Sequence, residues 1–219
     1  MTQVRPITDA ALPGWWHPLA DRAARIDGES ITRFLPPADG GREAGVLILL
    51  GSGDDGPDVV LTQRASSLRH HAGQPSFPGG VAEPGDASIV DTALREAREE
   101  IGLDPASVTV VTTLPELWIG VTDHRVTPVL AWWHSPHPIS AVDPAEVATV
   151  SRLSIHELAD PANRMRCRHP SGYIGPAFAA DGMLVWGFTA GVLAVVLRLG
   201  GWERPWDQNR ITDFDGGDP

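Results

Sequence analysis

Three glutamates and an arginine gather on one predicted helix, at residues 87–101. Glu96 lies three residues before Glu99 and four before Glu100, so a helix places all three carboxylates on one side. Like charges at this spacing destabilise a helix unless a cation neutralises them. Hard divalent cations such as Mg²⁺ prefer carboxylate oxygens, together with waters and substrate phosphates. The spacing therefore indicates a metal site for phosphate chemistry, and a surface helix with an ordinary Arg95–Glu99 pair is the alternative.

The elements that must position these carboxylates alternate between strands and helices. Gly102 suits a left-handed cap at the end of the glutamate helix, and Ala93, Ala97 and Ile101 form the apolar side that would pack on a sheet. Strands are predicted at 45–51, 58–63, 108–113, 126–133, 147–153 and 183–188, the first two as a hairpin and the last leading into a helix at about 189–199. This alternation predicts an α/β fold with a mixed sheet and helices on its faces.

The chain is expected to form one domain with additions at both ends. Its 219 residues suffice for one substantial core. Residues 1–43 predict an N-terminal helix, around Leu19–Ile26, and a linker, and residues 44–205 predict the main domain. Residues 64–85, rich in Gly, Pro, His and Ser, predict an ordered loop. Residues 206–219 predict a disordered acidic tail.

The composition limits which binding partners and which cellular compartment are expected. The net charge is −11 and all 17 basic residues are arginine, so a nucleic acid is not expected as partner. A single cysteine, Cys167, excludes an internal disulfide and fits a reducing compartment. The first sixteen residues lack a signal-peptide pattern, and the apolar run 187–197 is too short to span a bilayer, so a cytoplasmic protein without a membrane partner is expected. Eight tryptophans leave core packing and a homodimer interface both open.

The glutamate helix also resembles a known family signature. The segment FPGGVAEPGDASIVDTALREAREEIGL, residues 77–103, is similar to the Nudix box, G-x(five)-E-x(seven)-R-E-U-x-E-E-x-G-U, where U is bulky and apolar. The matching residues are Gly80, Arg95, Glu96, Glu99, Glu100, Gly102 and Leu103. Two departures are Ala97, which is small for its U position, and one extra residue between Gly80 and Arg95. The extra residue leaves the role of Asp86 open, because counting back from Arg95 puts Ala87 in the first acidic position.

This resemblance implies a Nudix α/β/α sandwich with a mixed central sheet and an added N-terminal helix. It also implies hydrolysis of a nucleotide diphosphate bond. Glu96, Glu99 and Glu100 would hold Mg²⁺ or Mn²⁺, one of them helping to activate water, and Arg95 would orient a glutamate. Glu146 is a further candidate ligand or base, and a solvated glutamate at a strand edge is an equal alternative.

A second resemblance lies immediately upstream. Residues 61–80 are similar to the signature of the coenzyme A diphosphatase branch of the Nudix family, L-L-T-x-R-[SA]-x(three)-R-x(three)-G-x(three)-F-P-G-G. The matching residues are Leu61, Thr62, Arg64, Ala65, Arg69, Gly73, Phe77, Pro78, Gly79 and Gly80, and Val60 replaces the first leucine. The predicted substrate-binding set drawn from this match is Arg64, Arg69, Gly73, Phe77, Gly79 and Gly80.

Coenzyme A carries a 3′-phosphate besides its diphosphate, and arginine forks recognise phosphate bidentately. Arg69, and then Arg64, are the candidate phosphate contacts, with pairing to nearby acids as the alternative. Two roles are left open for His70 and His71: contact with the substrate, or exposure to solvent. No Cys/His spacing supports a tetrahedral zinc site.

The two resemblances together imply cleavage of coenzyme A, or of an acyl or oxidised derivative, to 3′,5′-ADP and 4′-phosphopantetheine. A Nudix hydrolase for ADP-ribose, NADH or dinucleoside polyphosphates is the first alternative. A catalytically silent nucleotide-binding module is the second, and the retained Glu96, Glu99 and Glu100 argue against it.

Overall fold

The computed structural model describes residues 12–31, 36–37, 39–66 and 73–214. In chain order its elements are η2 (Gly14–Trp16), α1 (His17–Ala23), β1 (Arg42–Gly53), β2 (Gly56–Arg64), β3 (Pro75–Ser76), β4 (Gly79–Val81), α2 (Ile89–Ile101), η3 (Pro105–Ser107), β5 (Val108–Thr113), β6 (Leu117–Ile119), β7 (His124–Trp133), β8 (Val147–Ser154), α3 (Ile155–Ala159), η4 (Pro161–Asn163), β9 (Arg164–Arg168), β10 (Ile174–Ala180), β11 (Met183–Val185), α4 (Gly187–Gly200) and β12 (Ile211–Asp213).

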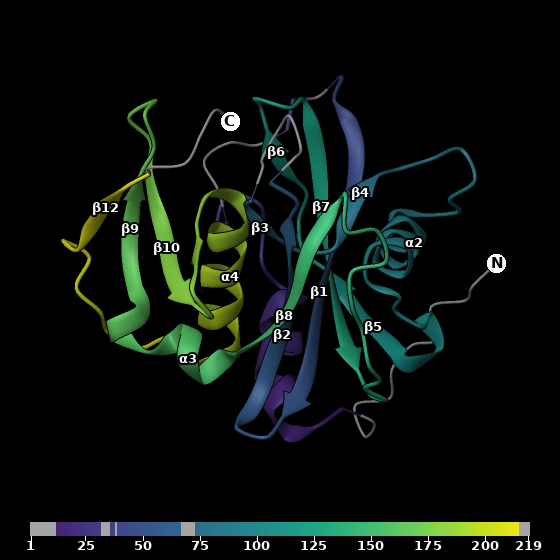
Figure 1. Cartoon of the computed structure of the whole chain (residues 1–219), viewed down its shortest axis with the longest axis horizontal. Helices are drawn as coiled ribbons and strands as arrows, with labels where there is room; N and C mark the ends of the chain where they lie inside the picture. The colour runs from purple at the N-terminus through teal and green to yellow at the C-terminus, as the bar shows by residue number, and fades with distance from the viewer. Residues whose placement is uncertain (1–11, 32–35, 38, 67–72, 215–219) are drawn as a thin grey trace.

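A mixed sheet forms the centre of the fold. Its strands follow the order β3-β2-β1-β7-β5, with β4 on β1, β6 on β7 and β8 on β2. The β1–β7 pair is parallel, and β1 pairs with β2 and β4 antiparallel. Along β1, Leu47 and Leu49 face α2, whereas Ile48 and Leu50 join the core formed with α1 and α4. The sheet is thus covered on both faces, which confirms the predicted α/β sandwich (Figure 1).

Most predicted elements are present near their expected bounds. The β1–β2 hairpin, β5, β7, β8, α2 and α4 all form, and the expected N-terminal helix is α1. Two of the eight tryptophans, Trp16 and Trp133, are fully buried in the cores. The prediction of a loop throughout 64–85 is wrong, because this segment contributes β3 and β4. Within the described ranges, no helix is long and apolar enough to cross a membrane.

A second sheet has the order β11-β10-β9-β12. Of its strands only β11, expected as a strand at 183–188, was predicted, and the sheet itself was not. Figure 1 shows α4 between this sheet and the central one. Its strand β12 pairs parallel with β9, at Ile211↔Arg166 and Asp213↔Arg168. This pairing corrects the prediction that the whole of 206–219 is disordered. Residues 215–219 lie outside the described part of the chain.

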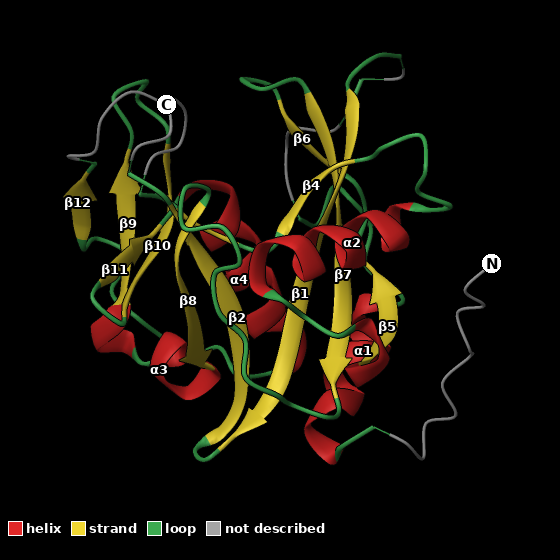
Figure 2. Ribbon diagram, turned by 45° about the vertical axis from the view of Figure 1, so that its right-hand side comes forward, coloured by secondary structure: helices red, strands yellow, loops and turns green. Residues whose placement is uncertain are grey.

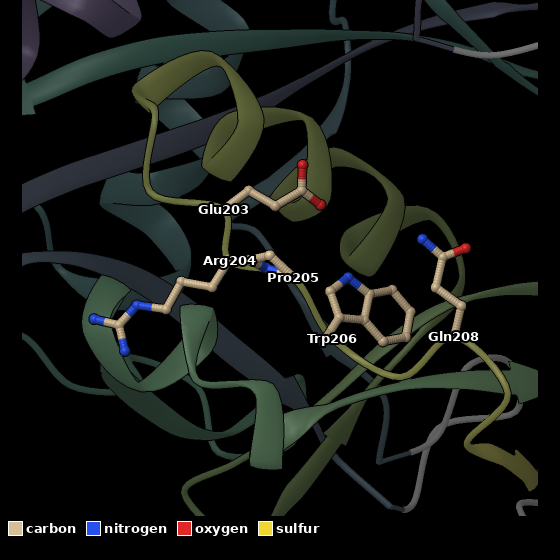
Figure 3. A pocket seen from close by; sticks show the side chains of 5 residues that line it. All are labelled: Glu203, Arg204, Pro205, Trp206 and Gln208. Atoms are coloured by element: carbon tan, nitrogen blue, oxygen red, sulfur yellow. The ribbon is translucent and has the colours of Figure 1, made fainter.

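Trp206, in the segment before β12, packs against the buried side chain of Arg164. The guanidinium of Arg164, which is 1% exposed, lies 4.5 Å from the centre of the Phe178 ring and 4.7 Å from that of Trp206. Trp206 borders a shallow hollow of about 460 Å³ lined by Glu203, Arg204, Pro205, Trp206 and Gln208 (Figure 3). The prediction of disorder rested on acidic composition and missed this aromatic contact, which is long-range in sequence.

Candidate active site

Helix α2 is fixed at both ends by local sequence. Ser88 precedes its first residue, and its hydroxyl oxygen accepts the backbone N–H of Asp91 at 3.3 Å. Gly102 closes the helix in the left-handed region, with φ 69°, and its N–H donates to the carbonyl of Arg98. The helix therefore starts two residues later than predicted and ends where the sequence indicated.

Small residues let α2 lie very close to the sheet, across the near face of β1 in Figure 2. Ala93 and Ala97 are fully buried in the core shared with β1. A Cβ at Gly45 of β1 would lie only 2.7 Å from the carbonyl oxygen of Ile89. The small Ala97 at a position where the Nudix box has a bulky residue is consistent with this close approach.

The glycine pair of β4 brings its backbone against the glutamates. A Cβ at Gly80 would lie 2.4 Å from Glu96 Oε1, so a side chain there would displace that carboxylate. The backbone N–H of Gly79 donates to Glu100 Oε2 at 3.1 Å. Both glycines had been predicted in the substrate-binding set, and the structure places them directly beside the carboxylates.

Arg95 links three carboxylates and β4. Its Nη1 donates to Glu96 Oε1 and Glu99 Oε2, each at 3.0 Å. Its role as the arginine that orients a catalytic glutamate stays a prediction. Its Nε and Nη2 donate to the two oxygens of Asp86 at 2.9 and 3.0 Å, and Nη2 also reaches the carbonyl of Val81. Hydrogen bonds to Asp86 raise the pKa of Arg95 above its ordinary value.

Asp86, whose role the sequence left open, is the bidentate partner of Arg95. Its Oδ2 also accepts the Thr92 hydroxyl and the N–H of Glu83, each at 2.9 Å. Bonding to Arg95, and then to Glu83, holds the pKa of Asp86 well below its ordinary range. Thr92 was missed by the sequence interpretation, although its position three residues before Arg95 puts both side chains on one helix face.

Glu100, like Glu96, is half-buried. The pKa of Glu100 is raised to about 7. Burial is the largest cause and the charges of Glu96 and Glu146 add to it, while the hydrogen bond from the Gly79 N–H and the charge of Arg64 oppose it. Burial also raises the pKa of Glu96, with the hydrogen bond from Arg95 opposing it. Glu99 is different, because its side chain is 54% exposed.

The segment that resembles the coenzyme A signature, residues 61–80, brings Arg64 close to the glutamates of α2. Arg64 contributes positive charge at Glu100, and its Nε is buried without a hydrogen-bond partner among the residues the structure describes. Gly73, with φ 70°, closes the base of the loop through its N–H, which donates to the carbonyl of Arg64. Arg69, His70 and His71 lie outside the described residues.

Two further candidates are Phe77, from the predicted substrate-binding set, and Glu146. Phe77 is 3% exposed in the core shared by α1 and α4, which corrects its prediction as a substrate contact to a packing role. Glu146 is exposed just before β8, its carbonyl accepts the N–H of Ala65 at 2.9 Å, and its charge acts on Glu100. Its role as ligand or base therefore stays a prediction.

Comparison with known proteins identifies the family. Residues 41–170, more than half of the chain, match the family described as NUDIX domain. The chain is a Nudix hydrolase. As a family member it acts on nucleoside diphosphate derivatives.

Two relatives and one solved structure illustrate the likeness. The chain is 35% identical over 184 residues to the uncharacterized Nudix hydrolase NudL of Citrobacter koseri, covering 80% of this chain and 88% of that protein. It is 37% identical over 182 residues to Nudix hydrolase 15, mitochondrial, of Arabidopsis thaliana, covering 79% of this chain and only 61% of that protein, less than two thirds of its length. The Nudix hydrolase RenU from M. smegmatis has a TM-score of 0.53 at 20% identity, over 78% of this chain and 92% of that one, which concerns the fold alone.

Nudix hydrolases generally use divalent cations such as Mg²⁺ or Mn²⁺, and the donors present fit such an ion. Within the part of the chain that the structure describes, no three His, Cys, Asp or Glu side chains are already assembled as a metal site. Glu96 and Glu99 are instead paired with Arg95. Glu100, however, is a half-buried carboxylate with negative neighbours, and carboxylate oxygens are the ligands that hard cations prefer.

Proposed function

We propose that this Nudix hydrolase cleaves the diphosphate of coenzyme A, or of its acyl or oxidised derivatives, to 3′,5′-ADP and 4′-phosphopantetheine. One observation carries the proposal: the two sequence signatures meet at the same carboxylates. Arg64, from the coenzyme A signature, lies near enough to Glu100 to lower its pKa, and Gly79 at the other end of that signature donates to the same side chain. The signature proposed to select the substrate therefore adjoins the residues of the Nudix box.

In this proposal Glu96, Glu99 and Glu100 hold Mg²⁺ or Mn²⁺. A bound divalent ion neutralises the diphosphate and lowers the pKa of an attacking water. Arg95 keeps Glu96 and Glu99 together through its shared Nη1, while Asp86 fixes the guanidinium plane. The N–H of Gly79 orients Glu100. Glu146 is kept as a further candidate, because its charge already acts on Glu100.

Recognition of the substrate is assigned to the arginines. The buried Nε of Arg64 is a donor without a partner among the described residues, and a phosphate oxygen would satisfy it. Arg69 is proposed to contact the 3′-phosphate, which distinguishes coenzyme A from dephospho-coenzyme A. The partner is thus a small nucleotide, and homodimer formation and a cytoplasmic location stay predictions.

Product analysis tests the proposal. Purified protein would be incubated with coenzyme A in Mg²⁺, in Mn²⁺ and in chelator, beside ADP-ribose, NADH and dinucleoside polyphosphates. Metal-dependent release of 3′,5′-ADP and phosphopantetheine, lost in Glu99→Gln, is expected. Cleavage of another substrate but not of coenzyme A would refute the substrate assignment, and cleavage of none would favour a silent binding module.

A further inference from the structure

The C-terminal end of α2, where Glu99 and Glu100 lie, is closed by a distant segment. The last carbonyls of a helix have no partner within it. Here the N–H of Gly102 donates to the carbonyl of Arg98 at 3.1 Å, and the N–H of Leu103 donates to the carbonyl of Ala97 at 3.4 Å. The carbonyls of Glu100 and Ile101 accept instead from Val142 at 3.0 Å and from Ser140 at 3.2 Å. Both donors belong to residues 134–146, which join β7 to β8 and are called the strap below.

These two bonds act where negative charge is already concentrated. A helix carries partial negative charge at its C-terminal end, and carboxylates there are unfavourable. Glu99 and Glu100 occupy the last turn of α2. The N–H groups of Ser140 and Val142 bring partial positive charge to that turn and fix its backbone. At its far end the strap reaches Glu146, whose charge also acts on Glu100.

His137 ties the strap to the residues that follow α2. Its Nε2 accepts the backbone N–H of Asp104 at 3.1 Å, and its Nδ1 lies 3.0 Å from the carbonyl of Pro138. A carbonyl can only accept, so Nδ1 carries the proton and Nε2 is free to accept, which requires the neutral ring in one tautomer. The ring also lies edge-on to buried Trp133, at 5.5 Å between centres.

We infer that His137 is a positioning residue for the carboxylates at the C-terminal end of α2, acting through the strap. It fixes Asp104 relative to the strap, and the strap in turn fixes the Glu100 and Ile101 carbonyls. The inference rests on the proposed metal site, because its effect is on the affinity of Glu99 and Glu100 for a divalent cation. His137 touches neither the substrate nor the carboxylates in this assignment.

Two substitutions separate the hydrogen bond of His137 from its packing. His137→Phe keeps a ring against Trp133 but removes the acceptor for Asp104, whereas His137→Gln supplies an amide oxygen as acceptor. His134→Phe is the matched control, because His134 is an exposed strap histidine whose ring lies edge-on to Trp132, as that of His137 does to Trp133. Among the described residues its side chain hydrogen-bonds only its neighbour Ser135, so it makes no bond to the residues that follow α2. Mn²⁺ binding by calorimetry and amide hydrogen exchange in the metal-free protein would be measured for all, with thermal melts to check folding.

In H137F the Kd for Mn²⁺ is expected to rise about tenfold, the low end for residues that support metal ligands. The amides of Ser140 and Val142 should exchange faster in the same variant, and H137Q and H134F should match wild type. Wild-type binding and exchange in H137F would overturn the inference, as would equal impairment in H137Q. If wild type bound no Mn²⁺, the metal site itself would fall, and with it the role of His137.

Discussion

Replacing Glu100 with glutamine should stabilise the metal-free protein while abolishing turnover. Glu100 is half-buried, and burial together with the charges of Glu96 and Glu146 raises its pKa to about 7 from an ordinary 4.5. A glutamine has nearly the same shape, and its amide oxygen can still accept the N–H of Gly79, which lies 3.1 Å from the present carboxylate. The substitution therefore removes the buried charge and keeps the hydrogen bond.

The sign of the pH dependence follows from the direction of this shift. Because the pKa of Glu100 is higher in the folded than in the unfolded protein, the protonated side chain favours folding. That contribution is complete below pH 4.5 and is lost as the pH rises through 7. At about 1.4 kcal/mol for each pKa unit, ionised Glu100 lowers the free energy of unfolding by roughly 3 kcal/mol at pH 8.

Thermal unfolding in chelator at pH 8 and near pH 5 would measure this effect. Glu100→Gln should melt roughly 6–12 °C above wild type at pH 8, with the difference shrinking towards pH 5. Glu99→Gln is the control, since Glu99 is 54% exposed and its removal should change stability by less than about 1 kcal/mol. A Glu100→Gln protein no more stable than wild type at pH 8 would refute the reasoning.

Three further substitutions test the rest of the site. Gly80→Ala places a Cβ 2.4 Å from Glu96 Oε1 and should lower kcat by at least about tenfold, measured as turnover against Mg²⁺ concentration. The control Gly85→Ala has open space around its Cβ and should match wild type. Equal effects of the two substitutions would contradict the displacement of Glu96. Asp86→Asn weakens the bidentate support of Arg95 and should lower kcat about tenfold with little change in KM, so a kcat within about twofold of wild type would argue against that support. Arg69→Ala should raise the KM for coenzyme A more than for dephospho-coenzyme A in steady-state kinetics, and equal increases would remove Arg69 from the 3′-phosphate.

Helix α2, which bears the three glutamates, could be predicted because its signals are local. Ala93, Ala97 and Ile101 repeat at helical spacing, and Gly102 provides the stop, all within one short stretch. Those features fix which side faces the sheet and therefore which side bears the glutamates. The same reasoning located the long strands β1, β2, β5, β7 and β8 of the central sheet, whereas the short β3, β4 and β6 were missed.

The second sheet could not be predicted in this way. Its strand β9, with the sequence RMRCR, alternates arginine with apolar residues and contains no turn signal of its own. Arg164 in this strand is buried by Phe178 and Trp206, which lie far from it in the sequence. Likewise, Asp86 could not be assigned from spacing alone, because an extra loop residue shifts the count without revealing which side chain meets Arg95.

Glu99 and Glu100 show most clearly what spacing leaves undetermined. Adjacent in sequence and both part of the Nudix box, they differ in environment because consecutive helical residues point about 100° apart. Arg95 donates to Glu99 and Glu96, whereas Glu100 turns under β4 towards Gly79. The charge left unneutralised in the metal-free protein is therefore centred on Glu100. The same substitution should consequently leave stability almost unchanged at one glutamate and increase it at the next, although both are proposed to serve one cation.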